Sequence, residues 1–158
     1  MFLEGSCHCG AVKFSLNSPH PYPFNRCYCS ICRKTQGGGG YAVNLSGDAA
    51  SLKISGEDNI SIYQVTRPGT GEISPMERRF CKICGSNLWC WDPRWPKLLH
   101  PFASAIDTPL PQPPAHTHLM TGSKAGWVPL EIQENDKVFE DYPDESIADW
   151  HARHRLEC

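Results

Sequence analysis

The sequence has no excess of charge of one sign. Its 15 lysine and arginine side chains stand against 17 aspartates and glutamates, which gives a formal net charge of -2. This balance creates no field that would attract nucleic acid or an anionic membrane surface. No segment approaches the run of about 20 apolar residues that a membrane-spanning helix needs. We therefore expect no nucleic-acid partner and no membrane partner.

The start of the sequence lacks the features of an export signal. Residues 1–5 contain neither a basic region nor an apolar core. We therefore expect a soluble protein of the cytoplasm, or of the nucleocytoplasm in a eukaryote. Thiols persist in such a reducing compartment, where they can hold a metal.

Long helices are also excluded, because 14 prolines and 13 glycines interrupt the 158 residues. Short runs with strand-like alternation lie between these breaks, and they predict a mainly β protein of antiparallel sheets. The runs cover residues 11–16, 41–45, 51–54, 60–65, 76–80, 87–91 and 116–120. One short helix is expected near the C-terminus, beginning at Pro143 or Asp144 and carrying Ile147 and Trp150 on one side. The length fits a single domain over residues 1–158.

Cysteine is abundant, and its nine positions are odd in number and tightly clustered. This pattern indicates metal ligands and not disulfides. Cys7 and Cys9 form one compact knuckle, Cys81 and Cys84 form another, and a glycine follows each. Glycine permits the sharp turn that a knuckle needs. We assign these four cysteines, the first cluster, to a structural zinc ion that ties the opening hairpin to the centre of the sheet.

Cys27, Cys29 and Cys32 form the second cluster, which has no obvious fourth sulfur nearby. Three protein ligands leave one position open, as in catalytic zinc sites. The alternative is a closed site completed by a histidine, by Cys90 or by Cys158, and spacing alone leaves both possibilities open. All-thiolate sites also accept iron, so zinc is an inference. Cys90, in an apolar run, is expected to pack in the core, and the terminal Cys158 to be a free thiol.

Three motifs together resemble the glutathione-dependent formaldehyde-activating enzyme (GFA) family, which includes a domain of centromere protein V. They are residues 5–10 (Gly-Ser-Cys-His-Cys-Gly), the Cys27-x-Cys29-x-x-Cys32-Arg33 segment with the glycine run after it, and residues 79–85 (Arg-Phe-Cys-Lys-Ile-Cys-Gly). The resemblance covers about residues 4–127, and residues 118–127 are similar to the closing strand of the family and the tryptophan after it. Residues 128–158 are then an extension packed on the domain.

The resemblance implies an Mss4-like fold, with small twisted antiparallel sheets around two zinc ions per chain. It implies a structural zinc at the first cluster, and it places the chemistry at Cys27, Cys29 and Cys32. The activity it implies is that of a carbon-sulfur lyase, which joins glutathione and formaldehyde to S-hydroxymethylglutathione. The expected partner is therefore a small thiol. The oligomeric state is not encoded in any motif.

Our mechanistic hypothesis is that a thiol substrate enters the open position of the second cluster, loses its proton and attacks a small electrophilic carbon. Arg33 could pair with a substrate carboxylate or be a surface charge. Residues 37–40, all glycine, could expose backbone N–H groups to an anion or form a turn. His116 and His118 would share one face of a strand, as a metal pair needs, although an ordinary strand is the simpler interpretation.

Several large side chains have predicted structural roles. Arg78 and Arg79 are expected to be solvated strand residues. The core candidates are Trp89, Trp91, Trp95 and Trp127.

A fold alone does not specify an activity, so a different class of function is also possible. If the second cluster had four protein ligands, we would expect a non-catalytic protein-binding module stabilised by zinc.

Overall fold

The computed structural model describes residues 1–36 and 38–156. The chain forms two compact units, each assembled from two separate stretches. The first unit contains Met1–Pro19 and Ser46–Leu110, and the second contains His20–Leu45 and Pro111–Cys158. Each cysteine cluster falls within one unit. A single domain over residues 1–158, with residues 128–158 as an extension, stays a prediction.

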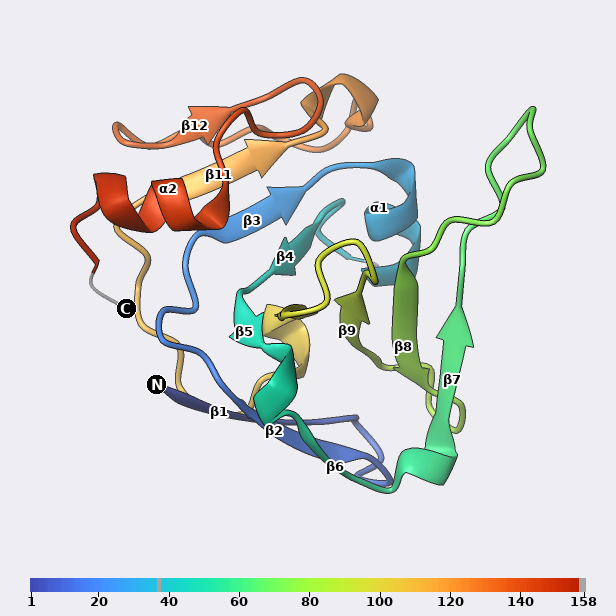
Figure 1. Ribbon diagram of the computed structural model, residues 1–158. Helices are drawn as coiled ribbons and strands as arrows, with labels where there is room; N and C mark the ends of the chain where they lie inside the picture. The colour runs from blue at the N-terminus through green and yellow to red at the C-terminus, as the bar shows by residue number, and fades with distance from the viewer. Residues whose placement is uncertain (37, 157–158) are drawn as a thin grey trace. The chain divides into compact units, whose positions relative to one another are not determined.

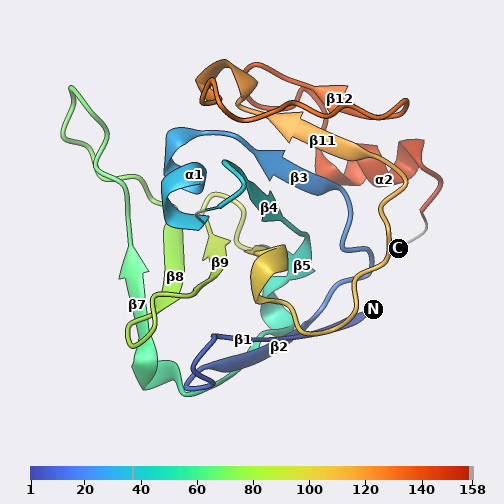
Figure 2. The same cartoon turned by 180° about the vertical axis from the view of Figure 1, so that it is seen from behind.

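The strands of the first unit form two antiparallel sheets, with the strand orders β1-β2-β6 and β5-β10-β9-β8-β7 (Figures 1 and 2). The connection between β7 and β8 extends away from its sheet in both views. The strands are β1 (Phe2–Ser6), β2 (Lys13–Asn17), β5 (Gly47–Asp48), β6 (Lys53–Ser55), β7 (Ile60–Tyr63), β8 (Glu77–Cys81), β9 (Asn87–Trp91) and β10 (Leu98–Pro101).

The core of the first unit follows from two sequence patterns. Along β2, Phe14 and Leu16 are buried whereas the strand ends are exposed, as alternation predicts. In β9, the consecutive residues Leu88, Trp89 and Cys90 are all buried, because this strand lies inside its sheet between β8 and β10. The rings of Phe14 and Trp89 pack with centroids 4.9 Å apart. The expected core positions of Trp89 and Cys90 are confirmed.

The second unit has one four-stranded sheet with the order β12-β11-β3-β4. Its strands are β3 (Phe24–Cys27), β4 (Ala42–Asn44), β11 (His116–Leu119) and β12 (Lys137–Val138). β3 is antiparallel to β4, but β11 runs parallel to both β3 and β12. The mainly β class with small antiparallel sheets is therefore confirmed, and these two parallel pairs are an addition to it. Parallel pairing needs a long connection, which the stretch between β3 and β11 supplies.

The short C-terminal helix is confirmed as α2 (Ile147–Arg153), but the expected start at Pro143 or Asp144 is wrong, because Ser146 caps the helix. It begins after Ser146, whose side chain caps the helix in a reciprocal capping box with Asp149. Trp150 is buried and packs near Tyr22 at a centroid distance of 6.2 Å. The His151 ring contacts the Tyr22 carbonyl at 2.8 Å. These contacts fix α2 to the segment before β3.

Other parts of the architecture differ from the expectations. A second helix, α1 (Ser30–Gln36), and the strands β1, β3, β5, β10 and β12 were not predicted. Arg78 is 6% exposed, so its solvated assignment is wrong. Trp95 and Trp127 are 52% and 64% exposed and are not core residues. No helix among the described residues is long and apolar enough to cross a bilayer.

Gly40 is a position where the fold requires glycine. Its φ is +83°, and a Cβ atom added there would lie 2.2 Å from a Val128 methyl group. We expect Gly40→Ala to lower the free energy of unfolding by about 2–3 kcal/mol, because left-handed strain and overpacking add. Gly126 is the matched control, since a Cβ there meets nothing within 4 Å and its φ is not positive. Urea unfolding of both variants tests this prediction, and equal losses would contradict it.

Candidate metal centres

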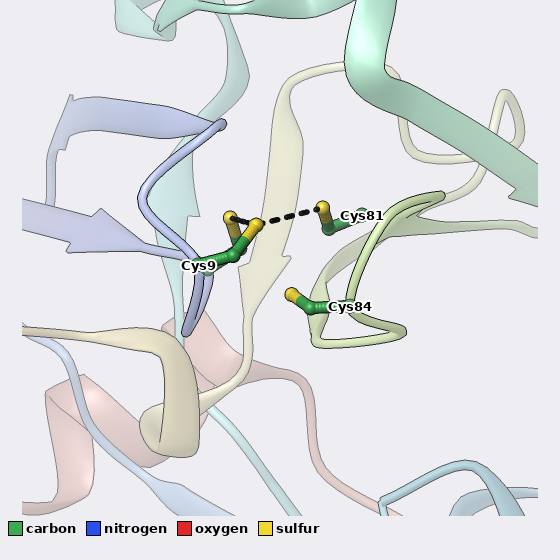
Figure 3. A group of neighbouring side chains, drawn as sticks. Cys9, Cys81 and Cys84 are labelled. Atoms are coloured by element: carbon green, nitrogen blue, oxygen red, sulfur yellow. Dashed lines mark hydrogen bonds between the residues drawn. The ribbon is translucent and has the colours of Figure 1, made fainter.

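The first cluster is assembled from two turns that are far apart in the sequence. Cys7 and Cys9 lie in the hairpin between β1 and β2, whereas Cys81 ends β8 and Cys84 lies in the turn after it. The four sulfur atoms all lie within 4.8 Å of one another. Figure 3 shows the side chains of Cys9, Cys81 and Cys84 converging on one point. The predicted grouping of these four cysteines is therefore what the structure contains.

The two turns of the first cluster have the same local design. Gly10 and Gly85 have positive φ angles of 75° and 76°. Their N–H groups donate to the carbonyls of Cys7 and Cys81 at 3.0 and 2.8 Å. Each turn thus reverses the chain immediately after its second cysteine. These positive φ angles explain why glycine occupies both positions, as the sequence suggested.

The spacing of the sulfurs fits a tetrahedral metal ion. Metal–sulfur distances of about 2.3 Å place the sulfurs of a tetrahedral site about 3.8 Å apart. Here Cys9 and Cys81 are separated by 3.8 Å and Cys7 and Cys9 by 3.5 Å. The Ser86 hydroxyl, 3.2 Å from the Cys84 sulfur, together with the Ser86 backbone lowers the pKa of Cys84 to about 5. The sulfur spacing therefore fits a tetrahedral cation, and Cys84 is the thiol of this cluster that its neighbours favour in the charged form.

The second cluster lies where β3 meets α1. Cys27 is the last residue of β3, and Cys32 lies in the first turn of α1. The sulfurs of Cys27 and Cys29 are 3.5 Å apart, and all three sulfurs lie within 4.8 Å of one another. Within residues 1–36 and 38–156, no fourth cysteine, histidine or carboxylate joins this group. Cys90 belongs to neither cluster, and Cys158 lies outside the described residues.

Protons are unequally shared among the three sulfurs of the second cluster. Hydrogen bonding to Cys29 and Cys32 raises the pKa of Cys27, and burial adds to the increase. The same kind of contact, from Cys27 and then Cys32, lowers the pKa of Cys29. The Cys32 N–H also donates to the Cys29 sulfur at 3.4 Å. Cys29 is therefore the favoured thiolate, and a cation would replace the shared protons.

Two features singled out in the sequence lie close to the second cluster in the chain. Arg33 follows Cys32 in α1, and its Nε is buried without a hydrogen-bond partner in the part of the chain that the structure describes. The close approach of Val128 explains why position 40 is a glycine. Gly37 lies outside the described residues.

Sequence reasoning did not find a buried polar group that contacts Tyr28, the residue between Cys27 and Cys29. The Tyr28 hydroxyl lies 2.8 Å from His118 Nδ1, and His118 Nε2 lies 3.0 Å from the Asp136 carboxylate. The predicted shared face of His116 and His118 is confirmed, but both rings are buried and face Asp136. The His-x-His spacing was a usable signal, whereas nothing marked Asp136.

The buried carboxylate of Asp136 makes the free energy of unfolding depend on pH. Burial raises its pKa, but the N–H groups of Gln133 and His116 and the His118 side chain outweigh burial and lower the pKa from 3.8 to about 2. The stabilisation is present above pH 3.8 and is lost as pH falls toward 2. We expect Asp136→Asn to cost about 2 kcal/mol at neutral pH and little near pH 2. Denaturant unfolding against pH tests this, and a constant cost at every pH would contradict it.

Comparison with known proteins identifies the family. The family model described as glutathione-dependent formaldehyde-activating enzyme matches residues 2–121. The chain belongs to the GFA family. All seven cysteines of the two clusters lie within the segment that matches the GFA model, whereas Asp136 and α2 lie beyond it. The resemblance seen in the sequence motifs is therefore confirmed.

Two individual proteins are similar to this GFA chain, one in sequence and one in fold. A Halomonas elongata protein, provisionally named a glutathione-dependent formaldehyde-activating enzyme, is 64% identical over 157 residues and is covered over 99% of both chains. The crystal structure of a Rhodobacter sphaeroides protein aligns with a TM-score of 0.54 at 24% identity, over 68% of this chain and 91% of that one. The second likeness concerns the fold alone.

Proposed function

We propose that this GFA protein is a zinc-dependent carbon-sulfur lyase that joins glutathione and formaldehyde to S-hydroxymethylglutathione. The observation that supports this most is the second cluster, in which three close sulfurs have no fourth protein ligand among the described residues. Membership of the GFA family supports the choice of substrates. The reaction needs no further reactant, because the thiol sulfur bonds to the formaldehyde carbon, the C=O π bond breaks and the thiol proton ends on oxygen.

The residues of the second cluster have separate roles in this proposal. Cys27, Cys29 and Cys32 would hold the ion. When bound, zinc supplies a positive charge that favours the thiolate form of a coordinated thiol. Cys27 and Cys29 keep two sulfurs 3.5 Å apart, which suits adjacent vertices of a tetrahedral site. The three cysteine sulfurs leave one vertex for the thiol of the substrate.

Arg33 is our candidate for binding the substrate in the correct orientation. Its buried Nε has no partner among the described residues, although a buried donor normally has one. Glutathione carries two carboxylates, and a guanidinium binds a carboxylate through two parallel hydrogen bonds. We therefore propose that Arg33 pairs with a carboxylate of glutathione.

The first cluster has a structural role in this proposal. Cys7, Cys9, Cys81 and Cys84 supply four sulfurs, which leave no vertex of a tetrahedral zinc ion for a substrate. The alternative function, a non-catalytic protein-binding module, would need a fourth protein ligand at the second cluster as well. The described residues offer three sulfurs there, which favours the enzyme.

Exchange spectroscopy with ¹³C-labelled formaldehyde tests the proposed activity. Glutathione and formaldehyde combine without an enzyme, so the informative quantity is the exchange rate between free formaldehyde and the adduct at equilibrium. We expect zinc-loaded protein to increase this rate in proportion to its concentration. Elemental analysis of the same sample should give two zinc ions per chain. An exchange rate that stays at the uncatalysed value with both sites loaded would overturn the proposal.

A further inference from the structure

A buried carboxylate in the second unit is linked to both residues that flank Cys27. One arm runs from Asp136 Oδ2 to His118 Nε2 at 3.0 Å, and from His118 Nδ1 to the Tyr28 hydroxyl at 2.8 Å. Tyr28 and His118 are 1% and 0% exposed. The two rings also stack, with an interplanar angle of 15°. This arm therefore holds the buried ring of Tyr28 through side-chain contacts.

The other arm runs from the same carboxylate to Arg26. Asp136 Oδ1 accepts the His116 backbone N–H at 2.6 Å, whereas His116 Nδ1, 3.3 Å from the same oxygen, makes no hydrogen bond among the described residues. His116 Nε2 lies 3.1 Å from an Arg26 guanidinium nitrogen. The guanidinium also lies over the Tyr41 ring, 5.5 Å from its centroid. Asp136 thus reaches the residue before Cys27 through His116 and the residue after it through His118.

The chemistry of Asp136 and Arg26 fixes the direction of the hydrogen bonds that they make. The ionised Asp136 carboxylate only accepts, so His118 Nε2 donates to it, and the Tyr28 hydroxyl bonds to the other ring nitrogen, Nδ1. The guanidinium only donates, so His116 Nε2 accepts from Arg26. Burial, and then the charge of Arg26, lowers the pKa of His116, which keeps its ring neutral for this role. The Gln133 N–H donates to Asp136 Oδ2 at 3.0 Å and holds the carboxylate in place.

We propose that Asp136, His116 and His118 form a positioning bracket that fixes Arg26 and Tyr28 on both sides of Cys27 and thereby orients the thiolates of Cys27 and Cys29. Groups outside the ligand shell orient the ligands of a metal and tune its affinity. The bracket provides this support from β11 and the loop before β12. Its residues act through the cysteines and are positioning residues, not catalytic ones.

The consequence for metal binding follows directly. The backbone N–H of Tyr28 donates to the Leu119 carbonyl at 3.0 Å, so the backbone and the side chain of Tyr28 are both held by β11. Removing the side-chain tether leaves the backbone tether alone. Cys27 and Cys29 then gain rotational freedom, and the bound ion is released faster. Loss of a partner outside the ligand shell typically costs about 10-fold to 100-fold in metal affinity or activity.

Zinc release to a chromophoric chelator tests the bracket without relying on activity. The zinc-loaded wild type should release its two ions in two phases, one for each cluster. We expect Tyr28→Phe and His118→Leu to accelerate one phase about 10-fold and to leave the other unchanged. Tyr41→Phe is the matched control, because it removes a phenol hydroxyl beside Tyr28 that is not part of the chain of hydrogen bonds. It should leave both phases unchanged.

His118→Gln separates positioning from general loss of structure. The glutamine amide offers one acceptor and one donor, as the neutral ring does, and should restore the release rate to within about threefold of wild type. Tyr28→Phe removes a single oxygen atom and keeps the experiment decisive if His118→Leu fails to fold. Equal acceleration of both phases, or no acceleration in Tyr28→Phe, would overturn the bracket.

The kinetic consequence rests on the proposed function and can fail separately from it. If the wild type catalyses formaldehyde exchange, Tyr28→Phe should lower that rate about 10-fold, and His118→Gln should retain most of it. If the wild type does not catalyse exchange, the proposed function is wrong, whereas the zinc-release phases still support or overturn the bracket.

Discussion

Replacing Cys81 with alanine is expected to unfold the first unit at physiological temperature. Structural zinc contributes about 10–16 kcal/mol to the folding of small zinc domains, whereas the net stability of a domain is about 5–15 kcal/mol. Cys81 is fully buried, and its sulfur lies 3.8 Å from that of Cys9, so its loss leaves three ligands and a cavity at the end of β8. Circular dichroism and the zinc content of the purified variant would measure the effect.

Cys90→Ala is the matched control for this variant. Cys90 is also buried, lies in the neighbouring strand β9 and belongs to neither cluster. Its truncation should cost only about 1–2 kcal/mol, as is usual for a small buried side chain, and should leave both zinc ions bound. Similar losses of structure in the two variants would contradict a structural role specific to the first cluster.

The largest expected effect on activity comes from replacing Cys29 with serine. Cys29 accepts hydrogen bonds from the Cys27 thiol and the Cys32 N–H and is the favoured thiolate of the second cluster. A catalytic metal lowers the activation barrier by several kilocalories per mole, and about 4 kcal/mol corresponds to a 1,000-fold change in rate. We therefore expect the formaldehyde exchange rate of Cys29→Ser to fall about 1,000-fold or to the uncatalysed value.

This variant should lose one zinc ion and keep the other. Because Cys29 lies in the second unit, the first cluster and its zinc serve as an internal control for folding. Cys90→Ala, which removes a thiol outside both clusters, should keep the wild-type exchange rate. If Cys29→Ser retained two zinc ions together with full exchange activity, the chemistry would not depend on the second cluster.

The cysteine clusters could be found from the sequence because their signal is local. Ligands two or three residues apart point to one ion through the geometry of a single turn, and glycine marks where the chain reverses. The joining of Cys9 to Cys81 across 72 residues followed from chemistry, since each pair of sulfurs needed another pair. Strand-like patterns in the sequence also predicted β2, which buries one face, and β11, which is buried over its whole length.

Other features could not be found in this way because they depend on the tertiary environment. β3 has no alternating pattern, since it lies between β4 and β11 and contains the polar residues Asn25 and Arg26. Asp136 acts on His118 from 18 residues away, and an aspartate in a polar segment carries no mark of burial. Trp127 has the composition of a core residue but is 64% exposed. The sequence therefore predicted the metal ligands well, but it did not predict the residues that surround them.

The different roles that we propose for the two clusters follow from their numbers of ligands. Four sulfurs complete a tetrahedral ion and favour a site that only stabilises the fold. Three sulfurs leave a vertex open, and groups outside the ligand shell can hold such ligands in place. The bracket of Asp136, His116 and His118 is our proposal for how the second unit does so. Of these three residues, Asp136 lies beyond the segment that matches the family model, so this proposal gives residues 128–158 a part in holding the second cluster.

The most direct test of an exchangeable position at the second cluster is ¹¹³Cd NMR of the cadmium-substituted protein during a titration with glutathione. Each cluster should give its own resonance, and Cys29→Ser identifies the one that belongs to the second cluster. We predict that glutathione shifts this resonance and leaves that of the first cluster unchanged. If neither resonance moves at saturating glutathione, the thiol does not reach the metal, and the second cluster is not the site of the proposed reaction.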